Sequence, residues 1–291
     1  MASASPNPAR RAVLITGASS GIGAASARVL VERGFRVWAG VRSADAAARL
    51  HELGEHCTPI VLDVTDAAQI AAAATTIASD GGLYGLVNNA GIAVGAPLEA
   101  IPLDALREQF EINVFGALAV TQAMLPLLRR TRGRIVMISS VQGRLAAPFV
   151  GPYAASKHAL EALSDALRAE LLPSGVDVAI VEPGAVKTPI WERSAKFGSA
   201  LGDAMDPELR ARYADEIAMM LRVSEKFAAR GIAPERVADA IAHALSARKP
   251  RTRYVVGFDA KVRVAIGSIV PDRARDRLLR AMLKRIALRP D

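Results

Sequence analysis

Cysteine is the residue that this chain has least of. Cys57 is its single cysteine among 291 residues, which excludes an intrachain disulfide framework and any metal site built from several thiolates. Because a lone cysteine usually behaves as a small apolar residue, Cys57 is interpreted as part of the core near the start of a strand. A chain without disulfides fits a reducing, cytoplasmic environment, and the sequence predicts no metal-binding residues.

Long apolar segments are also absent. Residues 1–11 are polar, lack the apolar centre of a signal peptide and are expected to be flexible. The longest uncharged run, 112–128, contains Asn113 and Pro126 and falls short of the roughly 20 apolar residues that cross a membrane. We therefore expect this run to form a buried helix.

Acidic residues are fewer than basic ones, 29 against 37, and the net charge is +8. Much of the excess lies after residue 247, and 271–291 is expected to form a basic helix with an apolar stripe. Such a stripe packs against the core or a second subunit by default, while the basic face is solvated. Contact with an anionic membrane surface is a less favoured alternative. No nucleic-acid partner is expected, since no nucleic-acid-binding motif accompanies the charge.

Hydrophobic residues make up 51% of the chain, which is enough for the core of one large domain. Short apolar runs alternate with helical stretches, and this pattern predicts a doubly wound α/β fold, a parallel sheet with helices on both faces. About seven strands are expected, at 12–16, 34–42, 59–66, 83–87, 134–140, 176–181 and 253–256. We expect one domain over 1–291, with ligands beyond the carboxyl ends of these strands.

The first predicted strand runs into the sequence T-G-x-x-x-G-x-G at 16–23, and a helical stretch follows. Glycines let the backbone approach a phosphate group, and a helix N-terminus offers unpaired N–H groups and the positive end of a dipole. We therefore predict a phosphate-binding turn between strand and helix. Its predicted cofactor contacts are Gly17, Ser19, Ser20, Gly21, Ile22 and Gly23.

Two further strand ends carry candidate ligands for an adenosine group. Arg42 follows the second strand, and no acid precedes Asp45. In dinucleotide-binding folds an acid here binds the ribose 2′-hydroxyl, whereas an arginine accommodates a 2′-phosphate. The sequence therefore favours NADP(H), with NAD(H) possible and a plain surface arginine as the alternative. Asp63 is a candidate for the adenine amino group, and Asp66 is predicted to cap the next helix.

Tyr153 and Lys157 lie four residues apart at the start of a predicted helix that Pro152 opens. This spacing places both side chains on one helix face. A free tyrosine keeps its proton up to a pH of about 10, and a neighbouring cation lowers that value. A tyrosine poised in this way can exchange the proton of a substrate C–OH group. Taken alone, the pair also fits an amphipathic surface helix.

Other segments have a functional and a plain interpretation. Asn113 interrupts a predicted helix at 103–128, which indicates a bound water or a kink. The run from Asn89 to Gly91 ends the fourth strand and either leaves room for a planar ligand or forms an ordinary turn. The segment 187–231 is interpreted as a substrate-binding lid, the alternative being an ordinary helical connection.

With these motifs in hand, the chain resembles the short-chain dehydrogenase/reductase family over about 13–256. The resemblance rests on Thr16-Gly17-x-x-x-Gly21-x-Gly23, Asp63-Val64, Asn88-Asn89-Ala90-Gly91, Asn113, Ser140, Tyr153-x-x-x-Lys157 and Pro183-Gly184-x-Val186-x-Thr188. It implies a Rossmann-like fold and transfer of a hydride between a nicotinamide and a secondary alcohol or ketone.

The resemblance also implies residue roles. Tyr153 is the general acid/base, Ser140 polarises the substrate oxygen, Lys157 holds the nicotinamide ribose and lowers the tyrosine pKa, and Asn113 anchors a water. The remaining implied cofactor contacts are Asp63, Val64, Asn89, Ala90, Gly91, Pro183, Gly184, Val186 and Thr188.

The sequence around these motifs is similar to that of the retinol and hydroxysteroid dehydrogenase branch, which implies a lipophilic substrate. The apolar run 145–150 suits such a substrate and equally suits core packing. The family also implies a homodimer or homotetramer. The alternative function is a cofactor-binding protein with a regulatory or structural role and little turnover.

Overall fold

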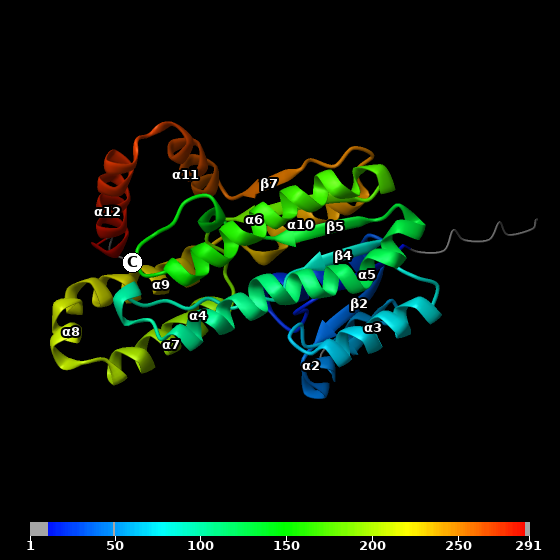
Figure 1. Ribbon diagram of the computed structural model, residues 1–291, viewed down its shortest axis with the longest axis horizontal. Coiled ribbons are helices and arrows are strands. Elements are labelled where there is room, and N and C mark those ends of the chain that lie inside the picture. Colours follow the sequence, from blue (N-terminus) through cyan, green and yellow to red (C-terminus); the bar gives the residue numbers. More distant parts are fainter. Residues whose placement is uncertain (1–10, 49, 289–291) are drawn as a thin grey trace, which may run out of the picture.

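The computed structural model describes residues 11–48 and 50–288 (Figure 1). Within these ranges the sheet has seven parallel strands in the order β3-β2-β1-β4-β5-β6-β7. The strands are β1 (Ala12–Ile15), β2 (Arg36–Val41), β3 (Cys57–Val61), β4 (Gly85–Asn88), β5 (Arg134–Ile138), β6 (Asp177–Pro183) and β7 (Arg253–Val256). The doubly wound Rossmann-like prediction is confirmed. The flexible segment predicted at 1–11 lies outside the described residues except for Arg11.

Helices cover both faces of this sheet. One face packs against α1 (Gly21–Glu32) and α10 (Pro234–Ser246), with α2 (Ala44–Ala48) at its edge. The other face packs against α3 (Ala67–Ser79), α5 (Ala117–Thr131) and α6 (Gly151–Leu171). Because the strands are buried on both sides, they are nearly continuous apolar runs.

The third strand differs from its prediction. It was expected at 59–66, but β3 ends at Val61. Asp63 instead accepts hydrogen bonds from the amide and hydroxyl of Thr65, at 2.9 and 2.8 Å. Asp66 caps α3 as predicted, since its carboxylate accepts from the amides of Ala68 and Gln69. Both acids satisfy local backbone donors, which competes with extension of the strand.

The long helix predicted at 103–128 is present but is not uniform. It consists of α4 (Leu103–Phe110), a π-helical segment (Glu111–Gly116) and α5. Asn113 lies inside the π-helical segment, and such segments often occur at functional sites. Leu103–Thr131 is long and apolar enough to cross a membrane, but half of its most apolar stretch is buried in this fold. The packing agrees with a buried core helix.

The segment 187–231 is helical, as expected. It contains α7 (Ile190–Ala204), α8 (Pro207–Arg212) and α9 (Ala214–Arg230). These helices project from one end of the sheet, where α11 (Phe258–Ile269) and α12 (Asp272–Leu288) also lie (Figure 1). Leu283 and Ala287 of α12 are buried against Val223 of α9. The apolar stripe of the basic C-terminal helix therefore packs within the chain itself.

Candidate active site

The glycine turn after β1 requires its glycines at defined points. Gly17 and Gly21 have φ angles of +66° and +56°, which residues other than glycine rarely adopt. At Gly23 a methyl group would lie 2.3 Å from the carbonyl oxygen of Gly17. Ser20 is the N-cap of α1 but its side chain makes no capping bond. The first amides of α1 are therefore left for an external acceptor.

Thr16 and Asn89 fix the shape of this turn. The side-chain amide nitrogen of Asn89 donates to the backbone carbonyl oxygens of Thr16 and Gly17, at 2.9 and 3.1 Å. The Thr16 hydroxyl accepts from the amides of Asn89 and Ala90, at 2.9 and 3.0 Å. The Asn89 side chain thus acts by positioning the turn. Thr16 was missed as a site residue in the sequence, although its place directly before Gly17 was a signal.

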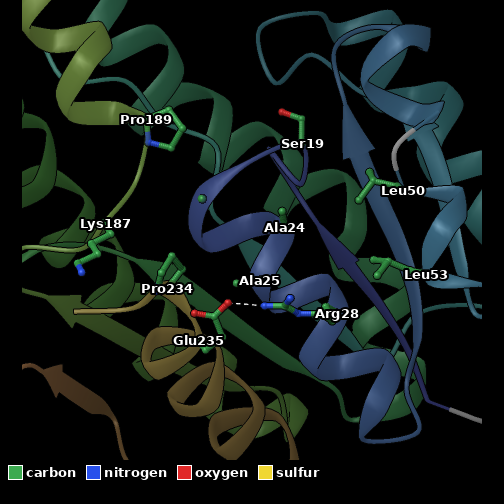
Figure 2. Close-up of a pocket in the computed structure, with 11 residues that line it drawn as sticks. Ser19, Ala24, Ala25, Arg28, Leu50, Leu53, Lys187, Pro189, Pro234 and Glu235 are labelled. Atoms are coloured by element: carbon green, nitrogen blue, oxygen red, sulfur yellow. Dashed lines mark hydrogen bonds and ion pairs between the residues drawn. The ribbon is translucent and has the colours of Figure 1, made fainter. Parts of the chain in front are cut away.

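A cavity opens beside the glycine turn (Figure 2). Its volume is about 380 Å³, and Ser19 and Gly21 line it on one side and Lys187 and Pro189 on the other. Figure 2 shows the Arg28–Glu235 ion pair between α1 and α10 at its far end. The cavity therefore joins the turn after β1 to the segment after β6.

The segment after β6 reaches the glycine turn through Thr188, as its predicted role requires. A methyl group at Gly21 would lie 3.0 Å from the Thr188 side chain. Gly184 donates its amide to Val256 at 3.0 Å, and Val186 pairs with Ile232. These bonds hold the backbone from Pro183 onward at the ends of β6 and β7.

Ser140, Tyr153 and Lys157 come together at the end of β5. The Ser140 hydroxyl hydrogen-bonds the Tyr153 phenol. The Lys157 ammonium donates to the carbonyl of Ile138 at 2.7 Å and lies 5.7 Å from the centroid of the tyrosine ring. Strand β5 supplies the serine, and the first two turns of α6 supply the other two. The sequence-predicted trio therefore forms one compact group.

The pKa values of this group are set mainly by burial. Burial raises the pKa of Tyr153, and the Ser140 hydrogen bond opposes that rise without cancelling it. Burial lowers the pKa of Lys157 to about 8, and the charge of Glu161 opposes this. The expectation of a lowered tyrosine pKa was therefore wrong for the protein's own groups, because desolvation of the phenolate outweighs the hydrogen bond from Ser140.

Asn113 is buried, at 1% exposure, and its side chain is fully engaged. The amide oxygen accepts from the Ile92 amide at 2.9 Å, and the nitrogen donates to the Ile92 carbonyl and the Ser156 hydroxyl, at 3.0 and 3.1 Å. Both N–H groups of the side chain are therefore used within the protein. The Ala117 amide donates to Val114 and does not close an α-helical turn onto the Asn113 carbonyl.

Gln109 was missed in the sequence. It is fully buried, accepts from the Val94 amide and donates to the Ile92 carbonyl, both at 2.7 Å. Together with Asn113 it fixes the loop after β4, including Gly91. Its signal was a single polar residue on the apolar face of a helix, four residues before Asn113.

The adenosine end of the site has its charged groups together. Burial acts to raise the pKa of Asp63, but hydrogen bonds from Thr65 and the charge of Arg42 together bring it below its ordinary value. Arg42 is exposed at the end of β2. Val64 is buried, and its side chain would lie 2.7 Å from a methyl group at Gly116, so it packs against the π-helical segment.

Comparison with known proteins decides the family. The family model described as short chain dehydrogenase matches residues 11–197. The chain belongs to the short-chain dehydrogenase/reductase family. Retinol dehydrogenase 5 of Mus musculus is 38% identical over 287 residues, covering 94% of this chain and 89% of that protein.

Two further members of the family are similar over nearly their full length. The NADPH-dependent 3-dehydrocapnine reductase of Ornithobacterium rhinotracheale is 34% identical over 285 residues, covering 95% of this chain and 98% of that protein. A short chain dehydrogenase from Burkholderia cenocepacia, solved in complex with NADP, has a TM-score of 0.71 and 29% identity, covering 97% and 98% of the two chains.

The site fits the nicotinamide dinucleotide that the family uses. The glycine turn leaves no room for side chains at Gly17 and Gly23, and residues of the turn and of the start of α1, among them Ser19, Gly21 and Ala24, line the cavity. A dinucleotide with a pyrophosphate needs such a close approach of backbone amides. This short-chain dehydrogenase/reductase is therefore an NAD(P)-dependent oxidoreductase.

Proposed function

We propose that this enzyme uses NADP(H) to interconvert a lipophilic secondary alcohol and its ketone. The observation that carries the proposal is the group of Ser140, Tyr153 and Lys157 at the end of β5. The Ser140 hydroxyl hydrogen-bonds the tyrosine phenol, and the lysine ammonium lies 5.7 Å from the ring centroid.

Each residue of the group has a part in the proposed reaction. The bound nicotinamide supplies the chemistry of hydride transfer. The Ser140 hydroxyl orients the substrate oxygen, and the Tyr153 phenol gives or takes the proton of that oxygen. The Lys157 ammonium holds the nicotinamide ribose and places a positive charge 5.7 Å from the centroid of the Tyr153 ring. Asn113 would hold a water through its backbone carbonyl and so connect Lys157 to solvent.

The preference for NADP(H) is supported by Arg42. Its guanidinium follows β2, where a 2′-phosphate of the cofactor is bound in dinucleotide folds. The Asp63 carboxylate nearby is occupied by two hydrogen bonds from Thr65, and it does not take the place of an acid at the end of β2. The names of two relatives, which mention NADPH and NADP, agree with this preference.

The lipophilic substrate is supported by the run 145–150 and the lid. Phe149 packs edge-on against Tyr213, with ring centroids 6.1 Å apart. Tyr213, between α8 and α9, donates to Glu99 at 2.9 Å. Phe149 keeps a φ of +67°, a strained conformation that a site can retain for function. The apolar run thus stands between the lid and the start of α6, which bears Tyr153.

We also propose that the enzyme forms a homo-oligomer through α5 and α6. Phe115 of the π-helical segment is 55% exposed, and the surrounding run carries no charge from 112 to 128. An exposed aromatic ring on an uncharged helix favours association. Light scattering of the purified enzyme and of Phe115→Glu tests this, and the variant is expected to dissociate. An unchanged mass would place the interface elsewhere.

The activity is tested by following nicotinamide absorbance with hydroxy- and keto-steroids, retinoids and long-chain alcohols, using NADP(H) and NAD(H) in parallel. Turnover of a lipophilic alcohol or ketone, faster with NADP(H), is the expected result. Tyr153→Phe is the matched control, since it removes only the proton-carrying hydroxyl. Turnover that survives in this variant would refute the mechanism.

A further inference from the structure

Two buried carboxyl groups lie close to each other, and one of them is next to Lys157. Glu161 is one helical turn after Lys157 on α6 and is 6% exposed, while Glu182, near the end of β6, is 0% exposed. Both pair with Arg253 of β7. Neither carboxyl has a part in the reaction described above, and a buried carboxylate is costly unless its oxygens are satisfied.

The two carboxyl groups compete for the same hydrogen-bond donor. The Arg253 Nε atom lies 3.2 Å from Glu161 Oε2 and 3.1 Å from Glu182 Oε1. This nitrogen carries one hydrogen, so it cannot satisfy both. Arg253 Nη2 donates to Glu161 and to Asp165, at 3.1 and 2.7 Å, and Arg144 donates to Glu182 Oε1 at 3.3 Å. These donors therefore reach the same oxygen of each carboxyl group, Oε2 of Glu161 and Oε1 of Glu182.

The second oxygen of each carboxyl group has no such donor. Among the described residues, Glu161 Oε1, Glu182 Oε2 and the Ser139 hydroxyl are buried and have no hydrogen-bond partner. A methyl group at Gly143 would lie 2.7 Å from that hydroxyl and 3.1 Å from the Glu161 side chain. Glu182 follows Val181, whose carbonyl accepts from the Ser139 amide at 2.8 Å. Two carboxylate oxygens and one hydroxyl group therefore lie in one region. The Ser139 O–H can donate to one carboxylate oxygen at most, and a protonated carboxyl group supplies the second donor that the other oxygen needs.

The charges decide which carboxyl group holds the proton. Burial and the charge of Glu161 raise the pKa of Glu182, and Arg144 and Arg253 oppose this without cancelling it. The charge of Glu161 also favours the ammonium form of Lys157. With Glu161 ionised and Glu182 neutral, the attraction between Glu161 and the Lys157 ammonium is kept. The repulsion between two neighbouring carboxylates is removed.

We propose that Glu182 is a neutral carboxylic acid at neutral pH, that its proton faces Glu161 and Ser139, and that the ionised Glu161 keeps Lys157 charged. Glu161 is thus a positioning residue that acts through Lys157, and this part rests on the proposed function. The charged groups around the pair are Lys157 and Asp165 on α6, Arg144 after β5 and Arg253 on β7.

Infrared difference spectroscopy tests the protonation state without any turnover. The wild-type enzyme at pH 7 is expected to show a carbonyl band of a protonated carboxylic acid that is missing in Glu182→Gln and present in Asp165→Asn, which also loses an Arg253 partner. Ser139→Ala keeps both carboxyl groups and should shift this band. A wild type without the band, a band lost in Glu161→Gln instead, or a band unmoved by Ser139→Ala would each overturn the assignment.

The pH profile of kcat/KM tests the effect on Lys157. Glu161→Gln is expected to move the alkaline limit down by about one pH unit, because an opposite charge close to the ammonium is lost. Glu182→Gln replaces one neutral group with another and should leave that limit in place, as should Asp165→Asn. Equal shifts in the two glutamate variants, or no shift in Glu161→Gln, would refute the role of Glu161. Failure of the proposed function would instead abolish turnover in the wild type.

Discussion

A methyl group at Gly23 is expected to damage the nucleotide site more than any other single-carbon change in the turn. It would lie 2.3 Å from the Gly17 carbonyl oxygen and 2.6 Å from the Asn89 amide nitrogen. These two atoms are themselves joined by a hydrogen bond of 3.1 Å. The methyl group would therefore clash with both atoms of that hydrogen bond. The Gly17 oxygen belongs to the backbone, so it cannot move aside as a flexible side chain could.

The size of the effect follows from these contacts. Overpacking in a closely packed region costs about 1–3 kcal/mol, and loss of the bond between Asn89 and Gly17 adds about 0.5–1.5 kcal/mol. Gly23→Ala should therefore lower the free energy of unfolding by roughly 1.5–4.5 kcal/mol. Because the displaced turn also presents the phosphate site, NADPH affinity should fall at least about 10-fold, which corresponds to about 1.4 kcal/mol.

Urea unfolding measures the first quantity, and NADPH fluorescence titration measures the second. Gly202→Ala is the matched control, because Gly202 lies in α7 and a methyl group there would meet no atom within 4 Å. That variant should gain about 0.5–1 kcal/mol from helix propensity and keep its NADPH affinity. If Gly23→Ala unfolds at the wild-type urea concentration and binds NADPH normally, the reasoning about the turn is refuted.

Three other outcomes are expected. Tyr153→Phe should abolish turnover yet bind NADPH with unchanged affinity in a fluorescence titration, since only the proton carrier is lost; a weakened complex would assign the phenol to binding. Arg42→Ala should weaken NADPH more than NADH by about 10- to 100-fold, the worth of a charged hydrogen bond of about 1.5–3 kcal/mol, and equal losses would argue against a phosphate contact. Burial lowers the pKa of Lys157 to about 8, so kcat/KM of the enzyme should fall as pH rises through this value, and a flat profile up to pH 10 would contradict a role for the ammonium.

The sheet was predictable because apolar runs bounded by turn residues are a strong signal. For the last strand, the first and last residues predicted from the sequence, Arg253 and Val256, are those of the structure. The third was displaced because Asp63 and Asp66 turn their carboxylates to nearby backbone amides, and apolar pattern carries no information about such bonds. The helix around Asn113 was found, but its π-helical turn was not, since it depends on how Gly116 packs against Val64.

The candidate site divides in the same way. The residues predicted to meet the cofactor or substrate, such as Tyr153 and Lys157, have motif spacing, and the structure brings these two together at the end of β5. Residues that fix other segments in place, such as Gln109, act through contacts between distant segments and have no motif. Residue pKa values were also out of reach, because burial decides the direction for Tyr153 and burial is known only from the fold.

Asn113 joins three segments that the reaction needs in register. Its side-chain amide accepts a hydrogen bond from the Ile92 backbone amide and donates one to the Ile92 carbonyl, in the loop after β4. It also donates to the Ser156 hydroxyl. Ser156 in turn donates to the Tyr153 carbonyl at 2.8 Å. Because Ser156 directly precedes Lys157 on α6, one side chain couples the loop after β4 to the helical turn that carries Tyr153 and Lys157. The π-helical turn allows this, since it leaves the Asn113 carbonyl free of the Ala117 amide while its side chain stays buried. A shift of either segment would therefore move Tyr153 and the π-helical turn together.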